Sequence, residues 1–398
     1  MRLLLVLTLS LLATILSSCS APNIANFSSS TVPIAATSRP RINLHGRPKT
    51  GPGKVLSSAY GGQILGFDID QNGTDGLLTE SLTEGSKLKS AIETFDIKTA
   101  KITKIVKQMV SSPNDDFVTF GIVGEDVGFV DEQRVSFNDI SRDDVFFLLS
   151  PVKSERITGR WKPPHVADSV LYQEAENQTT ISQVSVVFRN AFSSDVPWLY
   201  VWNSSTNKFE NFIRLTYTGE AMAEDTSTKQ AVLAGQDGSG APINTLVNLK
   251  TKKVTVFPGL NNGPYGAGAV NGLAVDSATG IACTTTELNA QVEFYHLAKE
   301  TGFAVQLPDT GPGSQADSGT VVANDSKNGL FFVAQPLSST SGGSSIYVYD
   351  EMGDLIESLD GFDFSGSSLP PTKISVDPSL RIGWVNGPNL NQLQQFSY

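Results

Sequence analysis

The strongest constraint on the fold of this chain is a strand–turn–strand pattern that recurs at a nearly constant spacing. An apolar or aromatic strand is followed by a polar turn of three to five residues and a shorter strand, as in Trp198–Trp202 and Phe209–Ile213. The first strands of these hairpins begin at Ile92, Val145, Trp198, Asn244, Val292 and Ile346, and a seventh strand begins at Leu393. Spacings of about 45 to 54 residues indicate stacked copies of one supersecondary unit.

A second hairpin precedes each of these in the sequence. Its clearest copies run from Gly272–Asp276 to Gly280–Cys283, from Thr320–Asp325 to Gly329–Val333, and from Lys373–Asp377 to Ile382–Val385. The Asp closes a turn by accepting hydrogen bonds from backbone N–H groups, and Gly takes the positive φ that follows. Two hairpins in about 50 residues predict a four-stranded antiparallel sheet, which is the blade of a β-propeller.

We therefore predict an all-β, seven-bladed β-propeller with four-stranded antiparallel blades over residues 54–398. The 345 residues of this segment, divided by seven, give about 49 per blade, close to the observed spacing. The last blade lacks an outer strand, and Lys54–Tyr60 at the N-terminal end could supply it, which would leave no open edge in the ring. A pair of β-sandwiches is the rival architecture, but it does not explain the regular spacing.

Within this body the sequence resembles bacterial seven-bladed propellers of the NHL and YVTN-like type. The resemblance depends on the Asp-x-x-x-Gly hairpin at Asp276 and Asp325, and on Asp377, where the Gly is missing. The segment Ile346–Phe362 is similar to a blade of exported acidobacterial-type lipoproteins of unknown function. The resemblance implies a fold and a binding or scaffold role, and it does not imply one chemistry.

The N-terminal segment has the features of a targeting signal. Arg2 precedes an apolar stretch, Leu3–Leu16, which is too short to span a bilayer comfortably. Leu16–Cys19 resembles the bacterial lipobox, which implies cleavage after a signal peptide of residues 1–18 and diacylation of Cys19. Ser20 in the next position implies sorting to the outer membrane. An ordinary secretory signal, and hence a plain secreted propeller, is the alternative.

Residues 19–53 are rich in Ser, Pro, Gly and Thr and predict a flexible tether between the lipid and the body. No Asp or Glu precedes Asp68, so the net charge of −11 divides into a basic leader and a body near −17. An acidic body argues against a nucleic-acid partner. The expected partners are the membrane, through the lipid anchor, and an unknown protein or glycan.

Few residues suggest metal or cofactor chemistry, and we expect no cofactor and no catalytic residue. Asp68, Asp70 and Asn72 match the start of a calcium loop, but the twelfth position is Thr79, where a bidentate carboxylate is needed. A simple turn is therefore favoured over a metal site. The three His do not cluster, and Cys283 is expected to be a buried free thiol.

Three long loops are expected to ring the mouth of the central channel: Gly259–Asn271, Pro308–Ser318 and Gly361–Pro371. Their polar residues are the candidate ligand-binding groups: Asn261, Asn262, Tyr265, Asn271, Asp309, Gln315 and Asp317. They could hold a polyol, a peptide or a cation, although solvated loops without a ligand are the simpler expectation. Aromatic residues of the third strands are expected to pack between blades in preference to stacking on a sugar: Trp198, Tyr200, Trp202, Tyr347 and Tyr349.

The leading hypothesis is a non-enzymatic, lipid-anchored propeller that presents a rigid acidic body to a partner at the cell envelope. A metal-dependent propeller hydrolase of the lactonase type is the alternative from a different class, and it needs carboxylates and Asn converging on a metal in the channel. Nothing in the sequence specifically supports a third class, the redox-cofactor propellers. No nucleophile elbow, P-loop or dinucleotide fingerprint is present.

Overall fold

The computed structural model contains 28 strands and one short 3-10 helix in the residues that it describes. The described residues are 52–70, 73–85, 87–111, 115–123, 127–134, 145–149, 155–161, 170–176, 183–190, 198–203, 208–216, 219–225, 227–236, 242–259, 270–286, 291–308, 321–335, 344–362, 373–386 and 391–398. The strands lie between Val55 and Ser397, and they confirm the all-β prediction.

The strands form seven antiparallel sheets of four strands each. The first three sheets are β2 (Gln63–Ile69), β3 (Asp75–Glu84), β4 (Lys87–Asp96) and β5 (Lys101–Ser111); β6 (Asp115–Val123), β7 (Val127–Arg134), β8 (Val145–Leu149) and β9 (Gly159–Trp161); and β10 (Val170–Glu176), β11 (Gln183–Asn190), β12 (Trp198–Asn203) and β13 (Lys208–Arg214). The fourth and fifth are β14 (Gly219–Asp225), β15 (Gln230–Gln236), β16 (Pro242–Asn248) and β17 (Val254–Pro258); and β18 (Val270–Asp276), β19 (Ile281–Thr286), β20 (Gln291–His296), the helix η2 (Leu297–Lys299) and β21 (Thr301–Gln306). The sixth is β22 (Val321–Asp325), β23 (Leu330–Gln335), β24 (Ser344–Asp350) and β25 (Leu355–Phe362).

The seventh sheet joins segments from the two ends of the body. It contains β26 (Ile374–Asp377), β27 (Ile382–Asn386), β28 (Gln392–Ser397) and β1 (Val55–Ser57), in that order. β1 lies antiparallel to β28, with Leu56 opposite Leu393. The backbone N–H of Gly53 also donates to the Gln395 carbonyl at 2.6 Å, so the pairing extends beyond β1.

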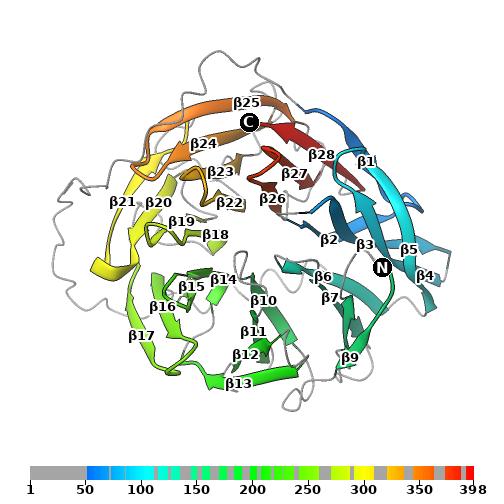
Figure 1. The fold of residues 1–398 in the computed structure, drawn as a ribbon, viewed down its shortest axis with the longest axis horizontal. Helices are drawn as coiled ribbons and strands as arrows, with labels where there is room; N and C mark the ends of the chain where they lie inside the picture. Colours follow the sequence, from blue (N-terminus) through cyan, green and yellow to red (C-terminus); the bar gives the residue numbers. More distant parts are fainter. Residues whose placement is uncertain are drawn as a thin grey trace, which may run out of the picture. The chain divides into compact units, whose positions relative to one another are not determined.

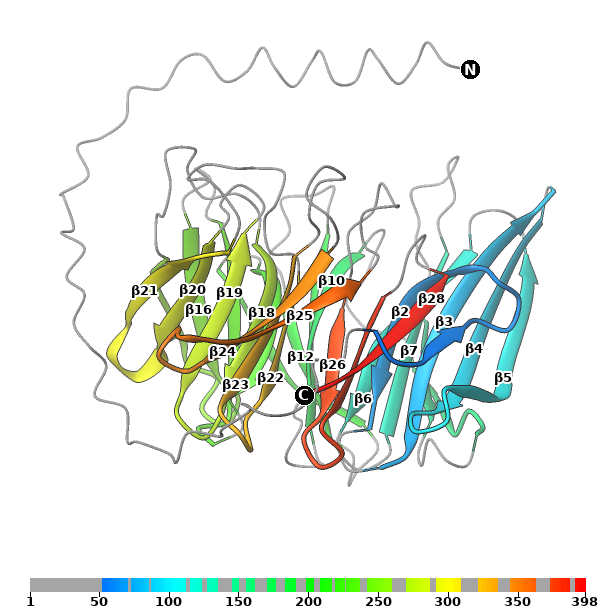
Figure 2. The ribbon, with the colours of Figure 1, turned by 90° about the horizontal axis from the view of Figure 1, so that it is seen from above.

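The first strand of each sheet contacts the first strand of the next sheet. β2, β6, β10, β14, β18, β22 and β26 are in contact in that order, and β26 in turn contacts β2. Figure 1 shows these strands towards the middle, while fourth strands such as β5, β17 and β25 lie at the periphery. Figure 2 shows β22 beside β18 and β19, which it contacts.

The Asp-closed turns predicted from the sequence are present between the first and second strands of several sheets. One carboxylate oxygen of Asp377, for example, accepts the N–H groups of Ser379 and Leu380 at 2.7 and 2.9 Å. The residue four positions after the Asp has a positive φ in each of four sheets: Lys229 (55°), Gly280 (68°), Gly329 (65°) and Arg381 (53°). The turn geometry therefore persists where Lys or Arg replaces the Gly.

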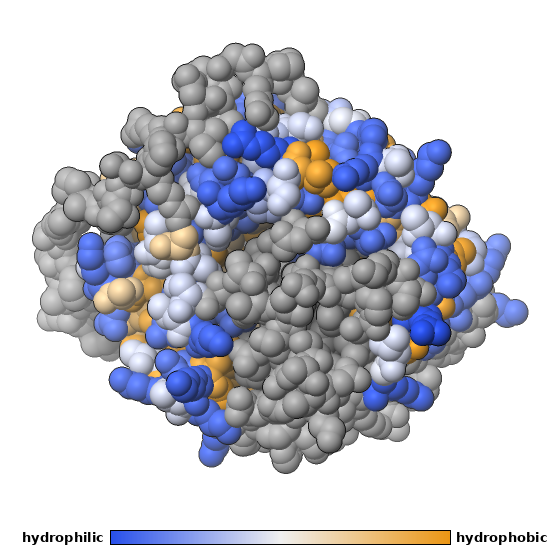
Figure 3. All heavy atoms as spheres, viewed as in Figure 1, coloured by the Kyte–Doolittle hydropathy of each residue, from blue (hydrophilic) through white to orange (hydrophobic). Residues whose placement is uncertain are grey.

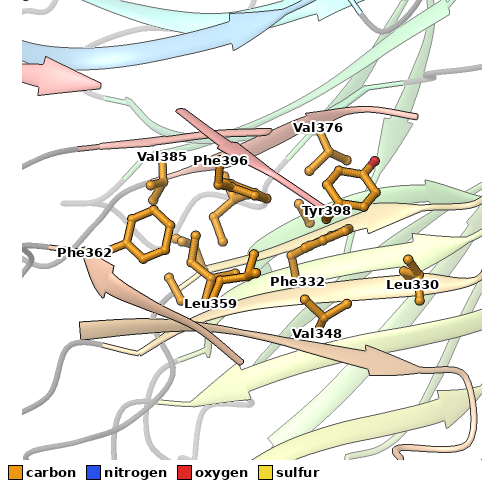
Figure 4. Close-up of a cluster of buried hydrophobic side chains, with 14 residues drawn as sticks. Leu330, Phe332, Val348, Leu359, Phe362, Val376, Val385, Phe396 and Tyr398 are labelled. Carbon is orange, nitrogen blue, oxygen red and sulfur yellow. The ribbon is translucent and has the colours of Figure 1, made fainter. Parts of the chain in front are cut away.

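In the described residues, the hydrophobic core divides into clusters that are each shared by two neighbouring sheets. Figure 4 shows the cluster shared by the sixth and seventh sheets, where Phe332 of β23 packs on Tyr398 with ring centroids 4.5 Å apart. Tyr347 and Tyr349 are buried in the cluster shared by the fifth and sixth sheets, as expected for packing residues. The side chains of Trp198, Tyr200 and Trp202 lie outside the described part of the structure, although β12 contains all three residues.

Two glycines allow an aromatic ring to lie flat on the neighbouring strand. Gly76 of β3 pairs with Phe95 of β4, and Gly383 of β27 pairs with Phe396 of β28. A Cβ on Gly76 would lie 2.2 Å from Cζ of Phe95, and one on Gly383 would lie 2.1 Å from Cζ of Phe396. Neither ring can stay in place if these positions carry a side chain.

We expect Gly76→Ala to lower the free energy of unfolding by about 1–3 kcal/mol, because the added methyl displaces a fully buried ring. Denaturant titration measures the change. Combining it with Phe95→Leu should recover part of the loss, since a smaller side chain leaves room for the methyl. Strict additivity of the two losses would contradict the proposed contact.

Candidate functional site

Asp68, at the inner edge of the first sheet, is bound by groups from the seventh. It lies in β2 and is 1% exposed. The ammonium group of Lys373, just before β26, donates to one carboxylate oxygen of Asp68 at 2.8 Å, and the Ser375 hydroxyl of β26 donates to the other. These bonds tie together first strands that are more than 300 residues apart in the sequence.

In the structure, the two described residues of the calcium-loop match, Asp68 and Asp70, form hydrogen bonds within the protein. Both oxygens of Asp68 have protein partners, and Asp70 sits in the tight turn between β2 and β3, where its N–H donates to the Asp75 carbonyl at 2.9 Å. Asn72 lies outside the described residues. Within the described ranges no three His, Cys, Asp or Glu side chains are grouped as metal ligands would be.

A pair of buried glutamates holds the segment that connects β1 to β2. We call this segment, Ser58–Gly62, the strap. Glu80 of β3 accepts the N–H groups of Tyr60 and Gly62 at 2.9 and 3.0 Å, and Glu93 of β4 accepts the N–H of Ala59 at 3.1–3.2 Å. Both glutamates have no exposed surface. The strap thus presents three backbone donors to two carboxyl groups, in the manner of a backbone nest around an anion.

The environment of this pair alters its protonation. Burial, then the hydrogen bond with Glu80 and the repulsion between the two carboxyl groups, raise the pKa of Glu93 to about 9. Glu93 therefore keeps its proton at neutral pH, and it can hydrogen-bond to Glu80 without placing two negative charges side by side. The proton on Glu93 therefore allows the two carboxyl groups to lie together beside the strap.

Glu80 and Glu93 were not predicted as a pair from the sequence, although alternation along the strands could have revealed them. Glu80 follows Leu78 by two residues, and Glu93 precedes Phe95 by two, so each shares a face with a core residue. A charged residue on the buried face of a strand is a signal for a partner, because an unpaired buried charge is costly.

The fifth sheet has an acidic residue at the position equivalent to Glu93. Glu293 of β20 pairs with Thr284, as Glu93 pairs with Leu78, and the Tyr295 hydroxyl donates to its carboxylate at 2.5 Å. Glu224 of β14 is also buried, and burial followed by the charge of Asp225 raises the pKa of its carboxyl group to about 8. Buried carboxyl groups are thus used for internal bonding in several sheets.

Tyr398 links the sixth and seventh sheets in the same way. Its hydroxyl donates to the Asp325 carboxylate at the end of β22 at 3.0 Å, and its backbone N–H donates to the Arg381 carbonyl at 3.2 Å. Burial, followed by the charge of Asp325, raises the pKa of Tyr398 well above its usual value. The Asp325 carboxylate therefore accepts hydrogen bonds both from its own turn and from the seventh sheet.

Most of the candidate ligand-binding residues lie outside the described residues: Asn261, Asn262, Tyr265, Asp309, Gln315 and Asp317. Asn271 is the second residue of β18 and so lies in a strand, not in a loop as expected. Cys283 is free and fully buried, which confirms that prediction. Cys19 also lies outside the described residues, and no helix within them has the length and hydropathy needed to cross a membrane.

The comparisons with known proteins identify the fold class. The structure of U3-55K has a TM-score of 0.58 at 12% identity, covering 87% of this chain and all of that one. A hydrazine synthase structure from Kuenenia stuttgartiensis has a TM-score of 0.58 at 10% identity over 86% of this chain and 97% of that one. These neighbours are β-propeller-type proteins.

The fold is propeller-like. A chain in the mitotic checkpoint complex has the same similarity, with a TM-score of 0.55 at 11% identity over 89% of this chain and 98% of that chain. No protein-family model matches the sequence, and no curated protein matches it. The TM-scores support the propeller-like fold. Sequence identities this low carry no activity or partner across to this chain.

Proposed function

We propose that the chain is a lipid-anchored, seven-bladed β-propeller of the NHL/YVTN-like type that acts as a binding or scaffold module at the cell envelope. Seven four-stranded sheets, with first strands in contact from β2 to β26 and back to β2, support seven blades. The pairing of β1 with β28 supports a ring in which the N-terminal strand completes the last blade.

The observation that carries the binding role is the internal use of the carboxylates on the first strands. Asp68 binds Lys373 and Ser375, and the carboxylates of Asp325 and Asp377 bind turn amides of their own sheets. Groups committed to rigid internal bonds stabilise a platform, and they are not poised for acid–base or nucleophilic work. Recognition then falls to the loops that connect the sheets, with an unidentified protein or glycan as partner.

Among the residues that the structure describes, no specific observation favours the alternative of a metal-dependent, lactonase-like hydrolase. Such a site needs at least three carboxylate or amide side chains that converge on one ion. Asp68, which the sequence offered as a weak metal candidate, has a lysine ammonium bound to one of its oxygens. A cation in its place would have to displace that ammonium.

The proposed lipid anchor on Cys19 would determine where the propeller body is located in the cell. A propeller body tethered through residues 19–53 to a diacylated Cys19 would stay at the envelope, since two or more acyl chains give stable membrane attachment. We propose the outer membrane as its location, with free secretion as the alternative. The junction between tether and body is fixed, because both Gly53 and Lys54 form backbone hydrogen bonds with Gln395.

The anchor is tested by metabolic labelling with palmitate. We expect the wild-type protein to be labelled and to stay with membranes, while Cys19→Ala should lose the label. Cys283→Ala is the matched control, because it removes the other cysteine and should keep the label. If Cys19→Ala retains the label, the proposed anchor is wrong. The partner is tested separately, by cross-linking in the native envelope and capture of the cross-linked protein.

A further inference from the structure

The first sheet and its flanking residues have a surface charge opposite to that of the body as a whole. Residues 54–108 contain seven acidic side chains, and four of them, Asp68, Asp70, Glu80 and Glu93, are buried. The lysines of the same segment are all exposed or half-buried: Lys54, Lys87, Lys89, Lys98, Lys101, Lys104 and Lys107. The surface of this sheet is therefore positive, although the body is near −17.

Two bulges in β5 place three of these lysines in one row. The three lysines are spaced three residues apart: Lys101, Lys104 and Lys107. In a regular strand this spacing would put each lysine on the face opposite to that of the next one. The register shifts between β4 and β5 correct this, so that the three lysines lie opposite Asp96, Thr94 and Ile92. These partners alternate along β4 and share one face.

This row lies on the outer edge of the molecule. β5 is the fourth strand of its sheet and lies at the periphery in Figure 1, and Figure 3 shows hydrophilic residues gathered along that edge. Lys104 is 3.8 Å from Glu155, and with about half of its side chain exposed this pair is screened by solvent. Lys101 and Lys104 are exposed, and Lys107 is half-buried.

The tether joins the body at the same edge. The ammonium group of Lys54 donates to the Lys98 carbonyl in the turn between β4 and β5, and the side-chain amide of Gln395 donates to the neighbouring Ile97 carbonyl at 2.8 Å. The end of the tether is thus held against the turn from which β5 begins. Residues 19–53 add Arg39, Arg41, Arg47 and Lys49 and contain no acidic residue.

We propose that the β5 edge, defined by Lys54, Lys98, Lys101, Lys104 and Lys107, docks on a membrane surface of anionic lipid head groups. This inference rests on the proposed lipid anchor, which would attach the body to the membrane through the chain that enters at this edge. Screening limits electrostatic attraction to about 8 Å at physiological ionic strength, so the lysines beside the junction contribute most. The acidic remainder of the body would face away from the lipid.

The test uses residues 20–398 without a lipid, a chain that contains every strand that the structure describes. Its partitioning is measured by sedimentation with vesicles of phosphatidylcholine alone and with about one-third phosphatidylglycerol. We expect binding only to the anionic vesicles, with weakening as salt is raised. Lys101→Gln, Lys104→Gln and Lys107→Gln together should reduce the partition coefficient about a hundredfold, at about fivefold for each lysine.

The matched control removes the same charge elsewhere. Lys250→Gln, Lys253→Gln and Lys299→Gln change three exposed lysines of the fourth and fifth sheets, and they should reduce binding less than about threefold. Melting temperatures confirm that both triple variants are folded. Equal losses in the two variants, equal binding to neutral vesicles, or no binding to anionic vesicles would each overturn the docking surface.

These outcomes are separable from those that test the anchor. Palmitate labelling of Cys19 without anionic-vesicle binding by residues 20–398 would leave the anchor standing and remove the docking surface. Binding of the unlipidated chain that depends on the β5 edge, together with absence of labelling, would support the surface and remove the anchor.

Discussion

Raising the pH from about 5 to about 9 should destabilise the wild-type protein, and Glu93→Gln should remove a large part of that dependence. The pKa of Glu93 is about 9 in the folded state against an ordinary value of 4.5, so the folded protein holds a proton that the unfolded chain releases. The contribution to stability is full below the unfolded pKa and is lost as the pH rises towards the folded one. The loss is about 1.4 kcal/mol per pH unit for one proton.

Glutamine keeps the shape of the protonated glutamate and cannot ionise. We therefore expect Glu93→Gln to match the wild type within about 1 kcal/mol near pH 5 and to be more stable near pH 9. Urea titrations across this range give the slope. Glu84→Gln is the control, since Glu84 is exposed and its pKa is lowered by Lys89, so it should leave the alkaline slope unchanged.

A variant with neither a carboxyl nor an amide group at position 93 should have a lower free energy of unfolding at every pH. Glu93→Ala leaves the Ala59 N–H without its acceptor and opens a cavity, so we expect a loss of about 2–4 kcal/mol. Cleavage by protease within the strap should increase at the same time. If Glu93→Gln shows the same pH slope as the wild type, the proton is not held at this pair, and Glu224, with a pKa of about 8, becomes the group to test.

Trp384→Ala should cause a loss of about 3–5 kcal/mol, because the indole fills the contact between the first and last sheets. Trp384 of β27 is fully buried and meets Phe95 of β4 edge to face, with ring centroids 5.7 Å apart. The same cluster contains Leu56 of β1 and Leu393 of β28. Removing the ring therefore weakens both the contact between the sheets and the support of β1.

The matched variant is Trp384→Phe, which keeps an aromatic ring in the cluster. The indole N–H has no hydrogen-bond acceptor among the described residues, so Phe loses volume and no polar bond. We expect a cost below about 1.5 kcal/mol. Hydrogen exchange should show faster exchange in β1 and β28 of Trp384→Ala. Equal stability of the Ala and Phe variants would contradict the structural role of the indole.

The periodic part of the fold could be predicted because its signals are local. An Asp, a short turn and an αL position lie within five residues, so the first hairpins of the fifth and sixth sheets can be located from sequence. β10 and β11 were not predicted, since no Asp and Gly at that spacing mark them. The first hairpin of the seventh sheet could also be located, from Asp377 and the strands beside it, although Arg381 and not Gly adopts the αL conformation there.

The internal bonds of the site depend on contacts that local patterns do not encode. Asp68 resembled a turn or a calcium ligand, and its partners Lys373 and Ser375 come from the opposite end of the body. Glu80 and Glu93 lie 13 residues apart in the sequence. The strap, whose N–H groups both of them accept, lies outside the strands that contain them. The polar loop residues were selected by composition, and composition alone does not determine which of them converge.

The short strand β1 also determines how the molecule would bear mechanical force. Any pull on the residues before Gly53 reaches the body first through the three-residue pairing of β1 with β28 and the bonds of Gly53 and Lys54 to Gln395. Behind them lies the strap, held by Glu80 and Glu93. If β1 separates from β28, the hydrogen bonds between the strap and the two glutamates bear the force next. Loss of the Glu93 proton places two negative charges side by side, so the force needed to detach the strap should fall.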